Sequence, residues 1–405
     1  MNKDVTRVEG IHYATGRPVR FNIRGGIIQA VEPLDGVEPL DGIQAVEHAG
    51  EDTGGRGGDH DGLPLVAPGL VDLQVNGFMG TDLNGPGLTA EQVDTMSLAL
   101  LRHGVTRFCP TLVTGPGERV LAALCALSEA AGGRGPASGA MAGIHMEGPF
   151  ISPEVGPRGA HPLKHCRMPD ISLLHRWMEA SGGRIRIVTL APELPGSIPF
   201  IRECVSLGII AAIGHTGATG AEIRAAAEAG ATLSTHLGNG SHSMLPRHPN
   251  YIWAQLAEDE LHATMIADGF HLDDAVLKVF FRAKGEKAIL VSDSMSHAGL
   301  PPGTYDSPIA GRVCLTPEGL LHMEGTPLML AGSASALLDG VRKMASIVGF
   351  VQAWDAGSAR PAGLLDPSGV HGLHPGAPAD LVLLEPGPDK MKIRSVYRAG
   401  FKEVP

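Results

Sequence analysis

Short hydrophobic runs alternate with amphipathic segments along the middle of the chain, from Leu65 onward. Runs such as VTRFCPTLV and IIAAIGH have the length and composition of buried strands, whereas TAEQVDTMSLALLRHG and GAEIRAAAEAG carry apolar residues at helical spacing. Strict alternation of strands and helices indicates a parallel sheet, and about eight such units fit a closed barrel of about 250 residues. The pattern therefore predicts an α/β fold, a (β/α)8 TIM-like barrel over residues 66–356.

The two ends of the chain follow a different pattern. Residues 1–65 and 357–405 contain short alternating strands separated by tight turns, such as those at ATGRP and RGG. We predict that these two segments pair in one small β-sandwich. Residues 305–330 interrupt the rhythm of the barrel, which predicts a β-hairpin inserted before its last helix.

A duplicated VEPLDG at residues 31–42 precedes a stretch rich in Gly and Asp. This composition predicts a mobile surface loop. We expect His48 and His60, which lie in it, to be solvated loop residues and not metal ligands.

The charge and cysteine content narrow the class of partner and the compartment. With 32 Lys and Arg against 43 Asp and Glu, the net charge of the 405-residue chain is −11. An acidic chain without a basic block argues against nucleic acid or an anionic membrane as the main partner. The five Cys form no CxxC pair, the first residues lack the apolar core of a signal peptide, and no apolar run approaches the roughly 18 residues of a membrane span. We therefore expect a cytoplasmic protein.

Four polar residues come directly after predicted strands: Glu147, His215, His236 and Asp293. Because the carboxyl ends of parallel strands meet at one end of a barrel, we expect these side chains to lie together. Each alone could be a turn or cap residue, but four at strand ends make coincidence a poor explanation. A carboxylate and two imidazoles suit one divalent ion, zinc first, with iron, manganese or cobalt as alternatives. The remaining acid could then move the proton of the attacking water.

A set of motifs in order along residues 65–340 makes the interpretation more specific: APGLVDLQVNG, GIHMEGPFISP, GAHP, IGHTGAT, STHLGN, IADGFH, VSDSMSHAG and LAGSASAL. In these motifs the chain resembles the N-acetylglucosamine-6-phosphate deacetylases of the amidohydrolase superfamily. The resemblance implies a barrel whose divalent metal is held by Glu147, His215 and His236, with Asp293 as acid and base. It implies hydrolysis of an N-acetyl amino sugar phosphate to acetate and the free amine.

Many amidohydrolases hold a second metal through His-x-His on the first barrel strand, where this chain has Gln74-Val75-Asn76. Amides are poor ligands beside imidazoles, so we predict a single metal ion and assign Gln74 and Asn76 to substrate binding.

The resemblance also implies residues that bind the substrate. His161 in GAHP, next to Ala160, would stabilise the developing oxyanion or contact a sugar hydroxyl. The phosphate would be bound by Arg247 and His271, with amide contacts from Asn239 and Gly240. In the family this arginine reaches into the partner subunit's site, which implies a homodimer.

One loop departs from the family pattern. After STHL the chain reads GNGSHSM and then LPRHPNYIWAQL, which adds His242, His248, Tyr251 and Trp253. In one interpretation residues 248–250 cap the next helix and the two aromatic residues pack against the protein. In the other the loop reshapes the substrate site, so that the substrate is another or an unphosphorylated N-acetylhexosamine.

Two further alternatives concern the class of protein. A dihydroorotase-like or D-aminoacylase-like amidohydrolase would use the same barrel, but no strand-end lysine lies where a carboxylated bridging lysine would be needed. An inactive barrel that serves as a scaffold is the other, and the intact Glu147, His215, His236 and Asp293 argue against it.

Overall fold

The computed structural model describes residues 6–34, 36–37, 62–307, 311–385 and 391–404. The chain divides into two compact units. One consists of Met1–Val71, Leu100–Arg107 and Leu337–Pro405, and the other of Asp72–Ala99 and Phe108–Ala336. The stretch around His48 and His60 lies outside the described residues, so its predicted character stays a prediction.

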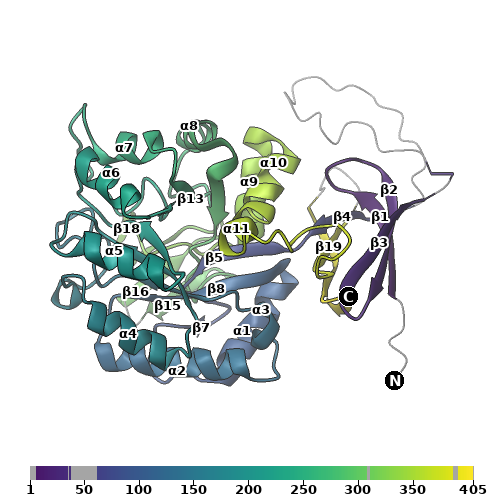
Figure 1. Ribbon diagram of the computed structural model, residues 1–405, viewed down its shortest axis with the longest axis horizontal. Helices are drawn as coiled ribbons and strands as arrows, with labels where there is room; N and C mark the ends of the chain where they lie inside the picture. Colours follow the sequence, from purple (N-terminus) through teal and green to yellow (C-terminus); the bar gives the residue numbers. More distant parts are fainter. Residues whose placement is uncertain (1–5, 35, 38–61, 308–310, 386–390, 405) are drawn as a thin grey trace. The chain divides into compact units, whose positions relative to one another are not determined.

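Eight strands form the parallel sheet of the barrel, in the order in which they occur along the chain. Figure 1 shows this sheet with helices around it. They are β5 (Leu70–Val75), β8 (Val105–Val113), β9 (Ile144–Glu147), β10 (Ile185–Leu190), β11 (Ile210–Ile213), β12 (Leu233–Ser234), β13 (His262–Ile266) and β14 (Ala288–Val291). A parallel bridge between Val75 and Ser294 links the first strand to the chain just after the last. The sheet thus returns on itself, and the predicted (β/α)8 class is confirmed.

Helices follow the barrel strands as the alternating pattern predicts. They are α1 (Ala90–Arg102), α2 (Gly117–Gly132), α3 (Ala137–Ala140), α4 (Ile171–Ala180), α5 (Ser197–Ser206), α6 (Gly220–Glu228), α7 (Tyr251–Ala257) and α8 (Asp274–Lys284). Several begin at a polar cap: Thr219 and Glu222 form a capping box on α6, and Asp170, Asn250 and Asp273 accept from backbone N–H groups of α4, α7 and α8.

The segment that interrupts the barrel forms a four-stranded antiparallel sheet, which is more than the single hairpin we predicted. Its strands are β15 (Gly303–Ser307), β16 (Gly311–Leu315), β17 (Leu321–Met323) and β18 (Thr326–Leu330). Gly319 and Gly325 have positive φ in the turns between β16 and β17 and between β17 and β18, which helps the chain to reverse there. A second small hairpin pairs β6 (Gly77–Phe78) with β7 (Thr81–Asp82).

Strands from both ends of the chain form one seven-stranded sheet, in the order β21, β20, β19, β4, β1, β2, β3. They span Phe401–Val404, Ile393–Arg398, Leu381–Leu384, Leu65–Pro68, Thr6–His12, Pro18–Arg24 and Ile27–Pro33. Phe21 of β2 and Leu381 of β19 belong to one buried core, although two strands separate theirs in the sheet. The sheet therefore curls over a common core, which fits the predicted sandwich.

Three helices belong to the same compact unit as this sheet: α9 (Leu337–Val348), α10 (Phe350–Ala356) and α11 (Ala359–Leu365). Trp354 donates from Nε1 to the carbonyl of Pro68 at 2.9 Å, and Tyr13 donates to Asp355 at 2.6 Å. The two compact units are divided near Val71 and Leu337, whereas the sequence predicts domain limits at 65 and 356. The predicted domain limits stay predictions.

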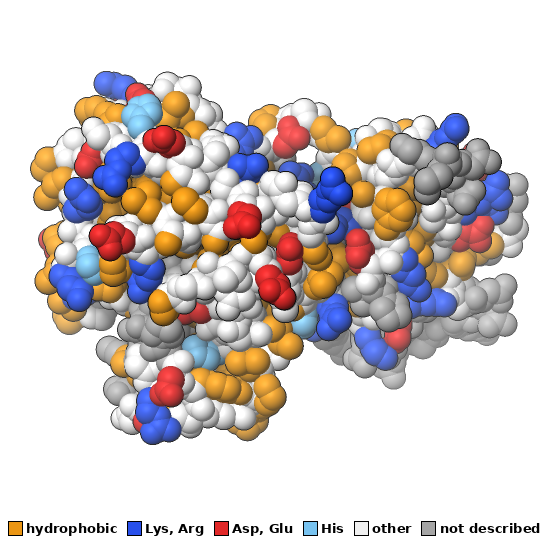
Figure 2. All heavy atoms as spheres, turned by 90° about the horizontal axis from the view of Figure 1, so that it is seen from below, with side chains coloured by type: hydrophobic (Ala, Val, Ile, Leu, Met, Phe, Trp, Pro, Cys, Tyr) orange, Lys and Arg blue, Asp and Glu red, His pale blue; other side chains and the backbone are white. Residues whose placement is uncertain are grey.

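The surface agrees with the composition. Figure 2 shows acidic and basic side chains interspersed on the face it presents, without a basic block. Within the described ranges, no helix combines the length and apolar character that crossing a membrane requires.

Candidate active site

The four candidate residues stand at the carboxyl ends of barrel strands. Glu147 is the last residue of β9, and the other three follow the ends of β11, β12 and β14. His215, His236 and Asp293 have φ angles of +51°, +29° and +49°, in the left-handed region that residues with a side chain rarely adopt. Such strain is kept where the surrounding structure has to hold a side chain in one orientation.

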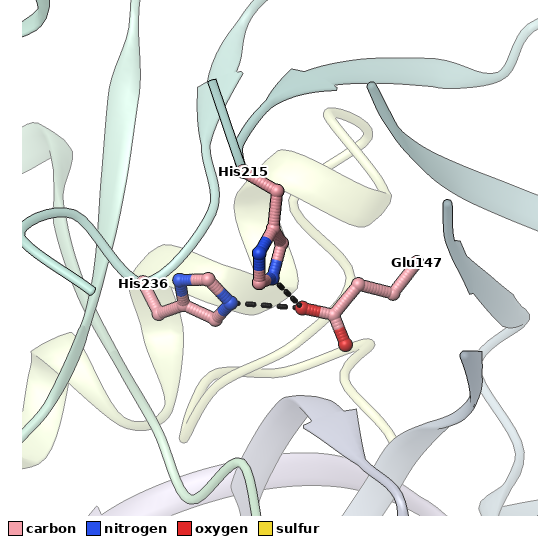
Figure 3. A group of neighbouring side chains, drawn as sticks. All are labelled: Glu147, His215 and His236. Atoms are coloured by element: carbon pink, nitrogen blue, oxygen red, sulfur yellow. Dashed lines mark hydrogen bonds and ion pairs between the residues drawn. The ribbon is translucent and has the colours of Figure 1, made fainter. Parts of the chain in front are cut away.

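Glu147, His215 and His236 form one compact, buried group, which we call the metal group because its side chains could hold an ion (Figure 3). Oε1 of Glu147 lies 3.0 Å from Nε2 of His215 and 2.8 Å from Nε2 of His236. One ligand atom from each of the three residues lies within 4.8 Å of the others. Two imidazole nitrogens and a carboxylate oxygen at this spacing fit the donor set of one divalent ion.

The ring of His215 is oriented by a backbone carbonyl. Its Nδ1 lies 2.8 Å from the oxygen of Pro157. Because a carbonyl only accepts, Nδ1 carries a proton, which leaves Nε2 as the atom that the ring would offer to a metal. A Cβ at Gly240 would lie 2.7 Å from this Nδ1, so the glycine leaves room for the ring.

The electrostatics of the group follow from its packing. Burial alone would raise the pKa of Glu147, but hydrogen bonds and charges of His215 and His236 outweigh it and hold that pKa well below its usual range. For His236 burial acts in the opposite direction and lowers the pKa. Glu147 and Asp293 together raise it more, so the net shift of the pKa is upward. The carboxylate therefore stays ionised, as a metal ligand must be.

Asp293 accepts a hydrogen bond from Asn76 and has a raised pKa. Nδ2 of Asn76 donates to Oδ1 of Asp293 at 2.7 Å. Burial and the charge of Glu147 raise the pKa of Asp293 to about 6, against the opposing effects of His236, His271 and Asn76. A carboxyl that titrates near neutrality can both accept and return a proton.

His161 lies against the metal group from the loop after β9. Its ring centroid is 4.4 Å from that of His215, and its Nδ1 lies 2.8 Å from the hydroxyl oxygen of Thr114. Burial and the charge of His215 lower the pKa of His161 to about 3, so the ring is neutral near pH 7. Ala160, beside it, is exposed.

The other predicted substrate residues are brought together only in part. Nδ1 of His271 lies 2.7 Å from Oδ2 of Asp268, and the charge of His271 lowers the pKa of Asp293, so this ring borders the group. The backbone of Asn239 donates to the carbonyl of His236 at 2.9 Å. Arg247, by contrast, is exposed and forms no ion pair with any residue in the described part of the chain.

Two amides have buried N–H donors that are free of protein partners in the described part of the chain. Among the residues described, Nε2 of Gln74 and Nδ2 of Asn239 lack a hydrogen-bond partner. Unpaired buried donors are costly, and a ligand can satisfy them. Asn76 is already engaged through Nδ2 with Asp293, so its predicted role in substrate binding is shared with orientation of that acid.

The divergent loop is anchored by residues that sequence reasoning did not single out as a unit. The backbone N–H of His242 donates to the hydroxyl of Tyr251 at 2.7 Å, and that hydroxyl lies 3.0 Å from Nδ1 of the same histidine. On its other side, Nε2 of His242 lies 3.0 Å from Glu154, which belongs to the loop after β9. Asn250 caps α7 and Tyr251 is buried, but Trp253 is half exposed, contrary to the packed arrangement.

Other contributors were missed for want of a signal. Pro157 acts through its backbone, and Thr114 is one hydroxyl among many. Glu193, which accepts from Thr216 at 2.5 Å and from the backbone of Gly217 at 2.7 Å, holds the chain after His215. Only Asp268 had a local signal, since it stands three residues before His271 in the ADGFH motif.

A parallel barrel with a buried carboxylate and two imidazoles at the carboxyl ends of its strands defines a metal-dependent hydrolase. The model of the Amidohydrolase family matches residues 65–401, and the chain belongs to this family.

Its relatives agree with the resemblance seen in the motifs. The chain is 36% identical over 351 residues to N-acetylglucosamine-6-phosphate deacetylase of Bos taurus, covering 83% of this chain and 82% of the relative. It is 31% identical to N-acetylgalactosamine-6-phosphate deacetylase of Escherichia coli O157:H7, covering 80% and 84%. A mutant N-acetyl-D-glucosamine-6-phosphate deacetylase of Mycobacterium smegmatis, solved with N-acetyl-D-glucosamine-6-phosphate, matches with a TM-score of 0.83 at 27% identity, covering 99% and 100%.

Proposed function

We propose that the protein hydrolyses the acetamide of N-acetylglucosamine 6-phosphate to acetate and glucosamine 6-phosphate. The observation that carries the proposal is the pair of contacts from Oε1 of Glu147 to Nε2 of His215 and of His236, at 3.0 and 2.8 Å, in an amidohydrolase barrel. The substrate is taken from the names of the relatives.

Glu147, His215 and His236 would hold one divalent ion, for which we assign zinc; iron, manganese and cobalt suit the same donors. When bound, such an ion supplies positive charge that polarises an amide carbonyl and acidifies a water molecule. We assign a single ion because Gln74 and Asn76 occupy the place of a second histidine pair, and amides are weak ligands.

Asp293 is the proton carrier in this proposal. Its carboxylate takes a proton from the water that attacks the carbonyl carbon and returns it to the nitrogen when the C–N bond breaks. Asn76 orients the carboxylate through Oδ1, which leaves Oδ2 for the proton. A pKa of about 6 lets Asp293 be ionised at neutral pH and still be protonated during turnover.

His161 and the substrate residues complete the proposal. We assign the hydroxyl of Thr114 as the donor to Nδ1 of His161. Nε2 then carries the proton and donates to the oxygen on which negative charge develops. We assign the sugar phosphate to Ala160, Gln74, Asn76, Asn239, Gly240, His271 and Arg247. Because Arg247 is exposed, it would serve the partner's site in a cytoplasmic homodimer.

Acetate release tests the proposal. The zinc-reconstituted protein is assayed in parallel on N-acetylglucosamine, N-acetylgalactosamine and their 6-phosphates, with a metal-chelated sample as control. We expect the highest kcat/KM on N-acetylglucosamine 6-phosphate and none in the chelated sample. Preference for N-acetylgalactosamine 6-phosphate would favour the activity named for the Escherichia coli relative. No acetate from any of the four would contradict deacetylation.

A further inference from the structure

A cavity lies beside β9, the strand that carries Glu147. It measures about 620 Å³ and is lined by residues from β8, α2, β9 and α4 and by the segment around Leu163–His165. Met146 of β9 lines it. Consecutive residues of a strand face opposite sides, so Met146 and Glu147 point to opposite faces of β9. The cavity is therefore separate from the metal group and lies on the other face of the same strand.

Positive charge gathers on its walls. Lys164, Arg167 and Arg176 all line the cavity. Arg119 joins them, because a Cβ at the lining residue Gly115 would collide with its guanidinium. This concentration of cations is unusual in a chain with a net charge of −11.

Among the described residues, three of these four cations form no close ion pair, although the charge of Arg119 acts on Asp82. Arg167 pairs with Asp170 at 3.5 Å. Over the described ranges, no carboxylate lies within 4.0 Å of Lys164, Arg119 or Arg176. Glu118, in the first turn of α2, adds one negative charge to the wall. Burial and the positive charges of Lys164 and Arg119 lower the pKa of His165, in line with a positive potential at this wall.

The walls combine these charges with an apolar surface. On α4, Leu173, Arg176 and Trp177 fall on one helical face by their spacing, and all three line the cavity. Trp177 is buried and packs against Phe150 at a centroid distance of 5.5 Å. An apolar wall beside long cationic side chains suits a small ligand that carries both an anionic group and an uncharged part.

We propose that this cavity binds a small phosphate monoester, at a site distinct from the metal group. Arginine forks bind the several oxygens of a phosphate through paired hydrogen bonds, and lysine adds a point charge. The volume lies within the range of small-molecule pockets and accommodates a sugar phosphate. The ligand would touch Thr114, which also lines the cavity and contacts His161.

Isothermal titration calorimetry tests the site with glucose 6-phosphate, which has no acetamide, and with inorganic phosphate. The test variant is Lys164→Glu/Arg176→Glu, both exposed residues outside the metal group. The matched control is Arg202→Glu/Arg224→Glu, which makes the same change in charge at exposed positions of α5 and α6. A third variant, Arg247→Ala, weakens the phosphate contact proposed for the substrate.

We expect a binding event that the test variant weakens at least tenfold and that the control pair and Arg247→Ala retain. A stronger response to glucose 6-phosphate than to inorganic phosphate would show that the apolar wall contributes; equal responses would leave a site for phosphate alone and overturn the assignment to a monoester. The proposal also fails if the test variant binds both probes as the wild type does, or if the control pair weakens binding equally. None of these outcomes depends on whether the protein deacetylates amino sugars.

Discussion

The side-chain amide of Asn76 donates a hydrogen bond of 2.7 Å to Oδ1 of Asp293, across the point where β5 meets the chain after β14. In amidohydrolases with His-x-His on the first strand, a metal ligand would stand at this position. In this chain the amide at this position instead orients the carboxyl group of Asp293, for which we propose the role of proton carrier.

Removal of this hydrogen bond should change the pH dependence of the reaction. The bond favours the ionised form of Asp293, so Asn76→Ala should raise the pKa of that acid above its present value of about 6. Because the reaction needs the carboxylate, activity falls as the pH drops through this pKa, and the acidic limb of the kcat profile should move to higher pH. The same limb in Asn22→Ala, a change on β2 of the other unit, should stay in place. An unshifted limb in Asn76→Ala would show that another group controls it.

Gly240 should be essential for metal binding. It has a φ of +57°, and a Cβ there would lie 2.7 Å from Nδ1 of His215, so Gly240→Ala should displace this imidazole and reduce zinc affinity by about 10- to 100-fold. Gly183 has a φ of +75°, and a Cβ there would meet nothing within 4 Å, so Gly183→Ala shares the backbone strain without the collision. Zinc affinity is measured by competition with a chelating dye. Equal affinity in the two variants would mean that the ring of His215 does not depend on this gap.

The divergent loop should depend more on the hydroxyl of Tyr251 than on the exposed contact between His242 and Glu154. Tyr251→Phe removes the partner of the backbone N–H and of Nδ1 of His242, which should cost about 1–3 kcal/mol of unfolding free energy. Glu154→Gln affects a pair whose carboxylate is 63% exposed, so it should cost less than about 1 kcal/mol. Urea unfolding compares the two. A larger loss of unfolding free energy in Glu154→Gln than in Tyr251→Phe would show that the contact of His242 with Glu154 contributes more to the stability of the loop.

Arg247 should matter only for phosphorylated substrates. Arg247→Ala should raise KM for N-acetylglucosamine 6-phosphate about tenfold or more and leave that of the unphosphorylated sugar unchanged, since a lost phosphate contact costs about 1.5–3 kcal/mol. Arg224→Ala, an exposed arginine on α6, serves as the control. An equal rise in KM for both sugars would remove the reason to assign the phosphate to Arg247.

The sequence predicts the barrel and the proximity of Glu147, His215 and His236 because both depend on local signals. Short apolar runs mark the strands, and Glu147, His215 and His236 are polar residues placed directly after them. What it cannot predict depends on contacts between distant segments. The carbonyl of Pro157 has no side-chain signature, although its hydrogen bond orients the ring of His215, 58 residues away in the sequence.

Contacts between distant segments also decide to which unit a helix belongs and how exposed a side chain is. The helices α9–α11 look like the last part of the barrel pattern, yet Trp354 and Ser358 bond to the carbonyls of Pro68 and Gly69, in the unit of the terminal strands. Trp253 is a large apolar side chain of the kind that usually packs inside a protein, but its position on α7 leaves it half exposed.

Metal content tests the central claim most directly. Wild-type protein reconstituted with zinc and freed of loosely bound ions is compared by mass spectrometry with Glu147→Gln, His215→Ala and Asp293→Asn, with acetate release measured on the same samples. The account predicts one equivalent of zinc in the wild type, a loss of bound zinc in the first two variants, and bound zinc without turnover in Asp293→Asn. Two equivalents in the wild type, or full zinc content after His215→Ala, would contradict it.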